Sequence, residues 1–226
     1  MKTLPEAVLW DMDGTLIDTE PYWITAEHEL VGAWGGTWTD ELAHQCVGND
    51  LIVTGEIIVA NSPVELSPRQ VVDYLIGRVI DQLADEVPWR PGARDLLADA
   101  VSKGVPNALV TMSWRSLAQT IVAAVDPGSF DAVVTGDEVS HGKPHPEPYL
   151  AAVRSLGVSA AASVALEDSP TGVRSATAAG VPTIAIPHVV PVPLIAGAVQ
   201  VPSLSGLRVA DLVDLAATAR RPPSRG

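Results

Sequence analysis

A short apolar run near the start of the chain, residues 7–10, is bounded by polar residues and predicts a buried strand. From residue 92 onward, helical spacing of apolar positions alternates with further short apolar runs. These runs predict strands near residues 107–112, 131–134, 162–167 and 182–186. The helical spacing predicts helices near residues 93–103, 114–125, 146–156, 170–179 and 208–218. Such alternation is typical of an α/β fold with a parallel sheet, right-handed crossovers and helices on both faces.

The segment between the first strand and this α/β region shows helical spacing and no convincing strand pattern. Ser67-Pro68 within it is a typical helix start, because serine caps a helix and proline fits its first turn. The helical spacing ends at a Pro-rich stretch, residues 88–92. The sequence therefore predicts a core domain, residues 1–16 and 90–226, into which a helical domain, residues 17–89, is inserted.

Composition limits the partners that we expect. The 226 residues include 14 Lys and Arg against 27 Asp and Glu, and the net charge of −13 disfavours binding to nucleic acid or anionic membranes. Cys46 is the single cysteine, which excludes an internal disulfide and fits a reducing compartment. The first residues lack the apolar run of a secretory signal, and no run reaches the ~18 residues of a membrane span. We expect a cytoplasmic monomer with a frayed tail at residues 222–226.

Two carboxylates follow the first strand, in the string Asp11-Met12-Asp13-Gly14-Thr15. Strand alternation sends both carboxylates to one face, where they repel each other unless a cation or a shared proton intervenes. In a parallel sheet this end of the strand is where ligands bind. Asp11 is a candidate nucleophile, metal ligand or turn residue, and Asp13 beside it suggests that one carboxylate attacks while the other transfers a proton. Gly14 permits the sharp turn, and Thr15 adds a hydroxyl and an amide.

Two later stretches supply hydrogen-bond donors and a cation. The strand near 107–112 ends at Thr111-Met112-Ser113, whose hydroxyls and amides suit a phosphoryl oxygen. Lys143 lies on a Pro-rich connection, which proline makes rigid, and its ammonium would neutralise charge on a transferring phosphoryl group. Taken singly, Thr111 also fits a helix cap and Lys143 also fits a solvated surface residue.

A second strand end carries adjacent carboxylates, Glu167 and Asp168, before a predicted helix. They face opposite ways in a regular strand, so at least one faces the same site as Asp11. Together these side chains predict an oxygen-rich cation site of the kind that binds Mg²⁺ with water and phosphate. An acidic helix N-terminus is the alternative reading for this pair.

The order of these motifs resembles the haloacid dehalogenase (HAD) superfamily over nearly the whole chain. Residues 16–20, the inserted helical block and residues 143–149 are similar to the β-phosphoglucomutase-like branch of sugar-phosphate phosphatases and mutases. The resemblance implies a Rossmann-like core with a parallel sheet and an inserted helical cap that closes over the site.

Carried over to this chain, the resemblance implies that Asp11 is the nucleophile, which forms an aspartyl-phosphate, and that Asp13 is the general acid and base. It implies that Thr111 and Lys143 bind the phosphoryl group. It also implies a Mg²⁺ ion held by Asp11, the Asp13 backbone carbonyl and Asp168, with Glu167 as a possible further ligand. The remaining substrate-binding candidates are Gly14, Met112, Glu20 and Trp23.

The cap departs from the mutase pattern at two places. Trp23 stands where mutases of this branch have a histidine, and residues 47–51 lack the arginine that grips a distal phosphate. We therefore expect a Mg²⁺-dependent phosphatase that acts on a small phosphorylated metabolite, a sugar or polyol phosphate. A phosphosugar mutase is the alternative. A binding module without turnover is a third possibility, against which the intact Asp11, Asp13 and Lys143 argue.

Overall fold

The computed structural model describes residues 3–47 and 49–219, so the tail expected at residues 222–226 lies outside the described part. The described residues form one six-stranded parallel sheet in the order β3-β2-β1-β4-β5-β6. The strands are β1 (Val8–Trp10), β2 (Asn107–Val110), β3 (Ala132–Val134), β4 (Val164–Glu167), β5 (Thr183–Ala185) and β6 (Ala198–Gln200). The parallel α/β fold is thereby confirmed. Strand β6 was not predicted, because it is a half-exposed edge strand of only three residues.

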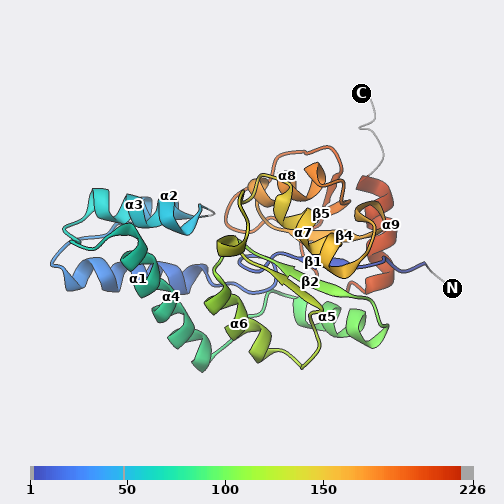
Figure 1. Cartoon of the computed structure of the whole chain (residues 1–226), viewed down its shortest axis with the longest axis horizontal. Coiled ribbons are helices and arrows are strands. Elements are labelled where there is room, and N and C mark those ends of the chain that lie inside the picture. The colour runs from blue at the N-terminus through green and yellow to red at the C-terminus, as the bar shows by residue number, and fades with distance from the viewer. Residues whose placement is uncertain (1–2, 48, 220–226) are drawn as a thin grey trace.

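Helices cover both faces of this sheet (Figure 1). They are α5 (Ala93–Ser102), α6 (Arg115–Ala124), α7 (Glu147–Leu156), α8 (Pro170–Ala178) and α9 (Val209–Ala219), with short 3₁₀ turns at Gly136–Glu138 and Ala160–Ala162. Trp10 packs in one apolar cluster with α5, α6 and α9, whereas Leu9 packs in another with α7 and α8. Successive residues of β1 are therefore buried on opposite faces, which explains why the strand is apolar throughout.

Strand β1 lies at the centre of the sheet, between β2 and β4. Trp10 pairs in register with Leu109 of β2 and with Leu166 of β4. The residues that follow these three strands consequently emerge side by side at one edge of the sheet. Asp11 and Asp168 are brought together in this way although 157 residues separate them in the sequence.

Four further helices form a separate group at one end of the molecule (Figure 1). They are α1 (Glu20–Ala33), α2 (Asp40–Cys46), α3 (Leu51–Asn61) and α4 (Pro68–Asp85), and we refer to them as the cap helices. The predicted start of α4 is confirmed, since Ser67 and Gln70 form a reciprocal capping box. No helix in the described part of the chain is long and apolar enough to cross a membrane.

The chain enters and leaves the cap helices through two adjacent segments. The Asp18 amide donates to the Pro88 carbonyl at 2.7 Å, and the Arg90 amide donates to the Leu16 carbonyl at 3.0 Å. Ile17 and Trp89 form an antiparallel bridge between these two bonds. The paired crossing lies only four residues after Asp13, so the cap helices join the core beside the first motif.

Candidate active site

A cavity of about 330 Å³ lies between the carboxyl edge of the sheet and the cap helices. This volume is within the usual range for sites that bind small molecules. The core contributes Asp11, Asp13, Gly14, Thr111, Met112, Lys143 and Asp168 to its lining, and the cap side contributes Glu20, Trp23, Glu27, Cys46, Asn49, Asp50 and Thr54. Of the residues predicted for the site, all but Glu167 line this one cavity.

A buried ion-pair network forms the floor of the site. The Lys143 ammonium donates to Asp11 Oδ1 at 2.6 Å, to Glu167 Oε1 at 2.7 Å and to the Val110 carbonyl at 2.9 Å. The Tyr149 hydroxyl donates to the same Glu167 oxygen at 2.8 Å. Glu167 is fully buried, and its other oxygen lies near the Ser169 hydroxyl at 3.3 Å. Asp11 Oδ2 accepts no hydrogen bond from the described residues, so this oxygen is free for chemistry.

Burial and the neighbouring opposite charges have opposing effects on the pKa values of Asp11 and Lys143. Burial is the main cause that raises the pKa of Asp11 to about 7, and the Lys143 ammonium limits the rise. Burial disfavours the charged form of Lys143, but Asp11 and Glu167 outweigh it and hold the pKa of Lys143 above its ordinary value. The two carboxylates therefore favour the cationic form of Lys143, which suits a group that neutralises phosphate.

Asp13 is held by hydroxyl groups rather than by a cation. Thr19 donates to Asp13 Oδ1, and Ser113 and Thr111 donate to Asp13 Oδ2 at 2.7 Å and 3.3 Å. Thr19 occupies the N-cap position of α1 without capping the helix, because its hydroxyl is directed to Asp13 instead. A carboxyl group held in this way has a fixed position and no permanent counter-charge, as a proton-transfer group requires.

Asp168 completes a group of three carboxylates. Oxygens of Asp11, Glu167 and Asp168 lie within 4.8 Å of one another. Burial is the main cause that raises the pKa of Asp168 well above its ordinary value, and the charge of Asp11 raises it further. Gly14 has φ +90°, and a Cβ there would lie 2.2 Å from Asp168 Oδ2, so only glycine fits this turn. Three crowded acidic groups that share one lysine are a donor set suited to a divalent cation.

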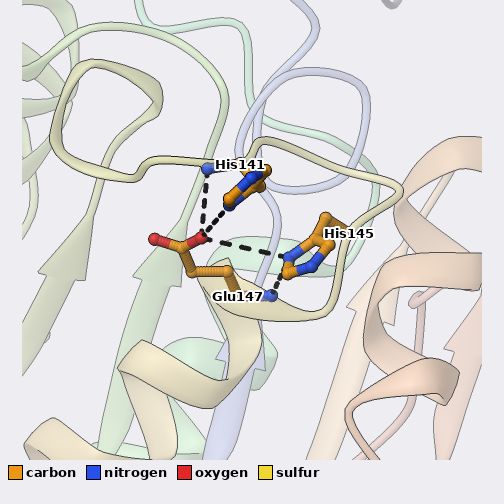
Figure 2. Close-up of side chains that lie close together, drawn as sticks. All are labelled: His141, His145 and Glu147. Atoms are coloured by element: carbon orange, nitrogen blue, oxygen red, sulfur yellow. Dashed lines mark hydrogen bonds and ion pairs between the residues drawn. The ribbon is translucent and has the colours of Figure 1, made fainter.

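The loop that carries Lys143 is held by Glu147 at the start of α7. Glu147 accepts hydrogen bonds from the backbone amides of Ser140 at 2.8 Å and His141 at 3.1 Å. Figure 2 shows the imidazole rings of His141 and His145 close to the same carboxylate. These hydrogen bonds account for the arrangement of the three side chains, which fix the loop that directs Lys143 into the site.

The first cap helix lines the opposite wall of the cavity. Glu20, Trp23 and Glu27 are spaced by three and four residues along α1 and line the cavity together. Burial is the main cause that raises the pKa of Glu20, and likewise that of Glu27, to about 7. Trp38 Nε1 donates to Glu27 Oε2 at 2.9 Å and partly opposes the shift of Glu27.

Glu27→Gln is expected to stabilise the protein at pH 8 by about 1–3 kcal/mol, and not at pH 5. Burial raises the pKa of Glu27 to about 7, so the folded state binds the proton more tightly than the unfolded state. The contribution of Glu27 to the stability of the wild type therefore falls as the pH rises between about 4.5 and 7, whereas Gln does not titrate. Urea unfolding of both proteins at the two pH values measures the difference, and a difference that does not depend on pH would contradict the assignment.

Sequence reasoning did not predict the bond of Ser113 to Asp13, and it did not select three other residues that the structure brings into the site. Ser113 and Thr19 hold Asp13, Tyr149 holds Glu167, and Glu27 lines the cap wall. Ser113 follows Thr111 by two residues, a spacing that could have indicated it. Glu27 follows Trp23 by one helical turn and could have been found in the same way.

Comparison with known proteins agrees with this geometry. The family model described as haloacid dehalogenase-like hydrolase matches residues 8–186. The chain belongs to the haloacid dehalogenase-like hydrolase family. The match contains both carboxylate strand ends and the whole helical insertion, so the HAD resemblance seen in the sequence is confirmed.

The relatives belong to the phosphatase branch of the HAD hydrolases. Hexitol phosphatase B of Escherichia coli (strain K12) is 32% identical over 185 residues, which cover 80% of this chain and 83% of the relative. The phosphorylated carbohydrates phosphatase of Thermotoga maritima is 33% identical over 184 residues, which cover 79% of this chain and 83% of that relative. The crystal structure of CbbY from Rhodobacter sphaeroides in complex with phosphate matches with a TM-score of 0.82 and 30% identity, and covers 93% of this chain and all of that one. This HAD protein is accordingly a phosphatase-type hydrolase.

Proposed function

We propose that the chain hydrolyses monophosphate esters of sugars or polyols by way of an aspartyl-phosphate on Asp11. The observation that carries the proposal is the arrangement around Asp11. One of its oxygens is bound by the Lys143 ammonium, and the other is free at the floor of a cavity that Asp13 also lines. The names of the relatives support a phosphorylated carbohydrate or hexitol as the substrate class.

In the proposed mechanism the free oxygen of Asp11 attacks phosphorus in line with the leaving alcohol. The new Asp11–phosphorus bond forms as the bond to the alcohol breaks, and Asp13 gives its proton to the departing oxygen. Water then attacks the aspartyl-phosphate and gives a proton to Asp13. Phosphate leaves, which restores the free carboxylate of Asp11 and the protonated carboxyl group of Asp13. Lys143 neutralises the phosphoryl charge in both steps.

The acidic group of the site fits Mg²⁺. Asp11, Asp168 and the backbone carbonyl of Asp13 would hold the ion, which would supply positive charge at the phosphoryl oxygens. Both oxygens of Glu167 already lie near donors from Lys143, Tyr149 and Ser169. We therefore propose that the main role of Glu167 is to position Lys143, and that binding of the ion is a secondary role.

The cap wall favours hydrolysis over mutase chemistry. A mutase must hold a bisphosphate intermediate at both ends. Among the described residues that line the cavity, Lys143 is the only Lys or Arg, and it lies at the reacting end. The two cap positions that differ from the mutase pattern, Trp23 and residues 47–51, contain no basic residue in the sequence that could bind a distal phosphate.

We further propose that residues 17–89 act as a cap domain on a core of residues 1–16 and 90–226. The paired crossing near Ile17 and Trp89 would be the hinge, and closure would exclude water from the aspartyl-phosphate until the alcohol has left. The cytoplasmic location and the monomeric state stay predictions from the sequence.

A phosphate-release assay over sugar, hexitol and other small phosphates, with and without Mg²⁺, tests the proposal. Release from carbohydrate phosphates that depends on Mg²⁺ is the expected result. We also expect Asp168→Asn to raise the Mg²⁺ concentration needed for half-maximal activity by roughly 10- to 100-fold, because one charged ligand is lost. Asp137→Asn, on the outer surface beside Arg115, is the matched control.

Three results would contradict the proposal. The first is full activity of the wild type in the presence of EDTA. The second is an unchanged Mg²⁺ requirement in Asp168→Asn. The third is transfer of phosphate between positions of a sugar without release, which would favour the mutase.

A further inference from the structure

Glu27 is an acidic side chain in the cap wall that the proposed chemistry does not use. It is only 3% exposed, yet it lines the same cavity as Asp11 and Asp13. It lies two helical turns from Glu20 along α1, so it reaches further into the cap than the residues next to the hinge. Its position corresponds to the part of a substrate that is remote from the reacting phosphate.

The hydrogen bonding of Glu27 is incomplete. Oε2 accepts from Trp38 Nε1 at 2.9 Å, and Trp38 is itself buried. Oε1 accepts no hydrogen bond from the residues that the structure describes. A buried carboxylate oxygen is costly unless it receives a donor, and the neighbouring cavity is the space from which that donor can come.

The remaining ionisable side chains of the cap wall are also acidic. Glu20 and Asp50 line the cavity with Glu27, and no Lys or Arg accompanies them among the described cap residues of the lining. His188 also lines the cavity, but it comes from the core, and its Nε2 lies 3.0 Å from Asp18 Oδ1. Such a wall attracts hydroxyl groups, which donate hydrogen bonds, and repels a second phosphate.

We propose that Glu27 is a specificity-determining residue that accepts a hydrogen bond from a hydroxyl of the substrate chain and excludes a second phosphate from the cap end. The inference rests on the proposed phosphatase function and adds to it the residue that recognises the hydroxyls of the substrate and rejects a second phosphate. Trp38 is a positioning residue, because it fixes the carboxylate with one oxygen directed to the cavity.

A purely structural role is the competing explanation, in which Glu27 serves only to satisfy the Trp38 indole. The two explanations differ in what they predict for substrates. A structural role affects all esters alike, whereas a specificity role affects only esters that carry hydroxyls at the cap end. The test therefore compares substrates within each variant.

The experiment measures kcat/KM of the wild type, Glu27→Gln and Glu27→Met on three esters: sorbitol 6-phosphate, p-nitrophenyl phosphate and fructose 1,6-bisphosphate. For sorbitol 6-phosphate we expect kcat/KM to fall by roughly 10- to 100-fold, mostly through a higher KM, as for loss of a hydrogen bond to a charged group. The fall should be larger for Glu27→Met than for Glu27→Gln. Activity on p-nitrophenyl phosphate, which has no hydroxyl, should stay within about 3-fold. The ratio of kcat/KM for sorbitol 6-phosphate to kcat/KM for fructose 1,6-bisphosphate should decrease in both variants.

Two further variants serve as controls. Glu29→Gln lies on the same helix but on the surface, paired with Arg78 at 2.8 Å, and should leave all three values unchanged. Trp38→Phe keeps the Glu27 carboxylate and removes the indole that donates to it. This variant should also lower kcat/KM for sorbitol 6-phosphate, but by less than the Glu27 variants do.

Equal losses on sorbitol 6-phosphate and p-nitrophenyl phosphate would overturn the inference and leave the structural role. Unchanged values on all three esters in Glu27→Met would overturn it as well. Failure of the proposed function is a separate result, because the wild type would then release phosphate from none of the esters, p-nitrophenyl phosphate included.

Discussion

Asp11→Asn is expected to lower phosphate release by about 10⁴-fold or more while the protein stays folded. The amide cannot form the acyl-phosphate, and no other carboxylate lies at the end of the central strand with a free oxygen beside Lys143. Stability should change little. A buried charge is removed, and the Lys143 ammonium keeps its bonds to Glu167 and to the Val110 carbonyl. Phosphate release and thermal unfolding measure the two effects.

Asp81→Asn is a suitable control, since this exposed residue on α4 only pairs with Arg78. Its activity should equal that of the wild type. Trapping of ³²P-labelled protein by acid quench should detect the aspartyl-phosphate in the wild type and not in Asp11→Asn. Turnover retained by Asp11→Asn would show that another group attacks phosphorus.

Lys143→Met is expected to cost about 3–5 kcal/mol of stability and most of the activity. Met has a similar length but no charge, so Asp11 and Glu167 would remain as neighbouring buried carboxylates without a cation between them. The side chain of Lys143 is only 5% exposed, and water cannot replace its charge. Urea unfolding measures the loss of stability.

Lys103→Met provides the comparison at the surface. Lys103 also pairs with a carboxylate, Asp99, but its side chain is 39% exposed, and its loss should cost at most about 1 kcal/mol. Equal destabilisation by the two substitutions would contradict the prediction, because the buried ion pairs of Lys143 would then stabilise the protein no more than the exposed pair of Lys103.

The sequence predicted the elements whose signals are local. The strands that became β1 to β4 are buried on both faces and therefore read as short apolar runs, even without neighbours in view. The start of α4 at Ser67-Pro68 was predicted for the same reason, because a helix cap depends on adjacent residues. The motif residues Asp11, Asp13, Lys143 and Asp168 were proposed from their order and from the strands that precede them.

Strand β6 and the partners of the motif residues depended on the fold. Residues 198–200 become a strand where β5 offers them an open edge, and a strand of three residues is too short to show a pattern of its own beforehand. Ser113 and Thr19 are separated by 94 positions, yet both bond to Asp13. No local pattern relates residues that far apart.

The sequence by itself determined the order of most elements and the position of the helical segment between β1 and β2, and it supplied the candidate residues for phosphoryl transfer. Only the tertiary structure decided that Lys143 bridges Asp11 and Glu167 and that Glu27 lines the cap wall with one oxygen free. The physical reason is that backbone preference and apolar spacing act within a few residues. Charge pairing and cavity shape depend on distances between segments that meet only when the sheet and the cap helices have assembled.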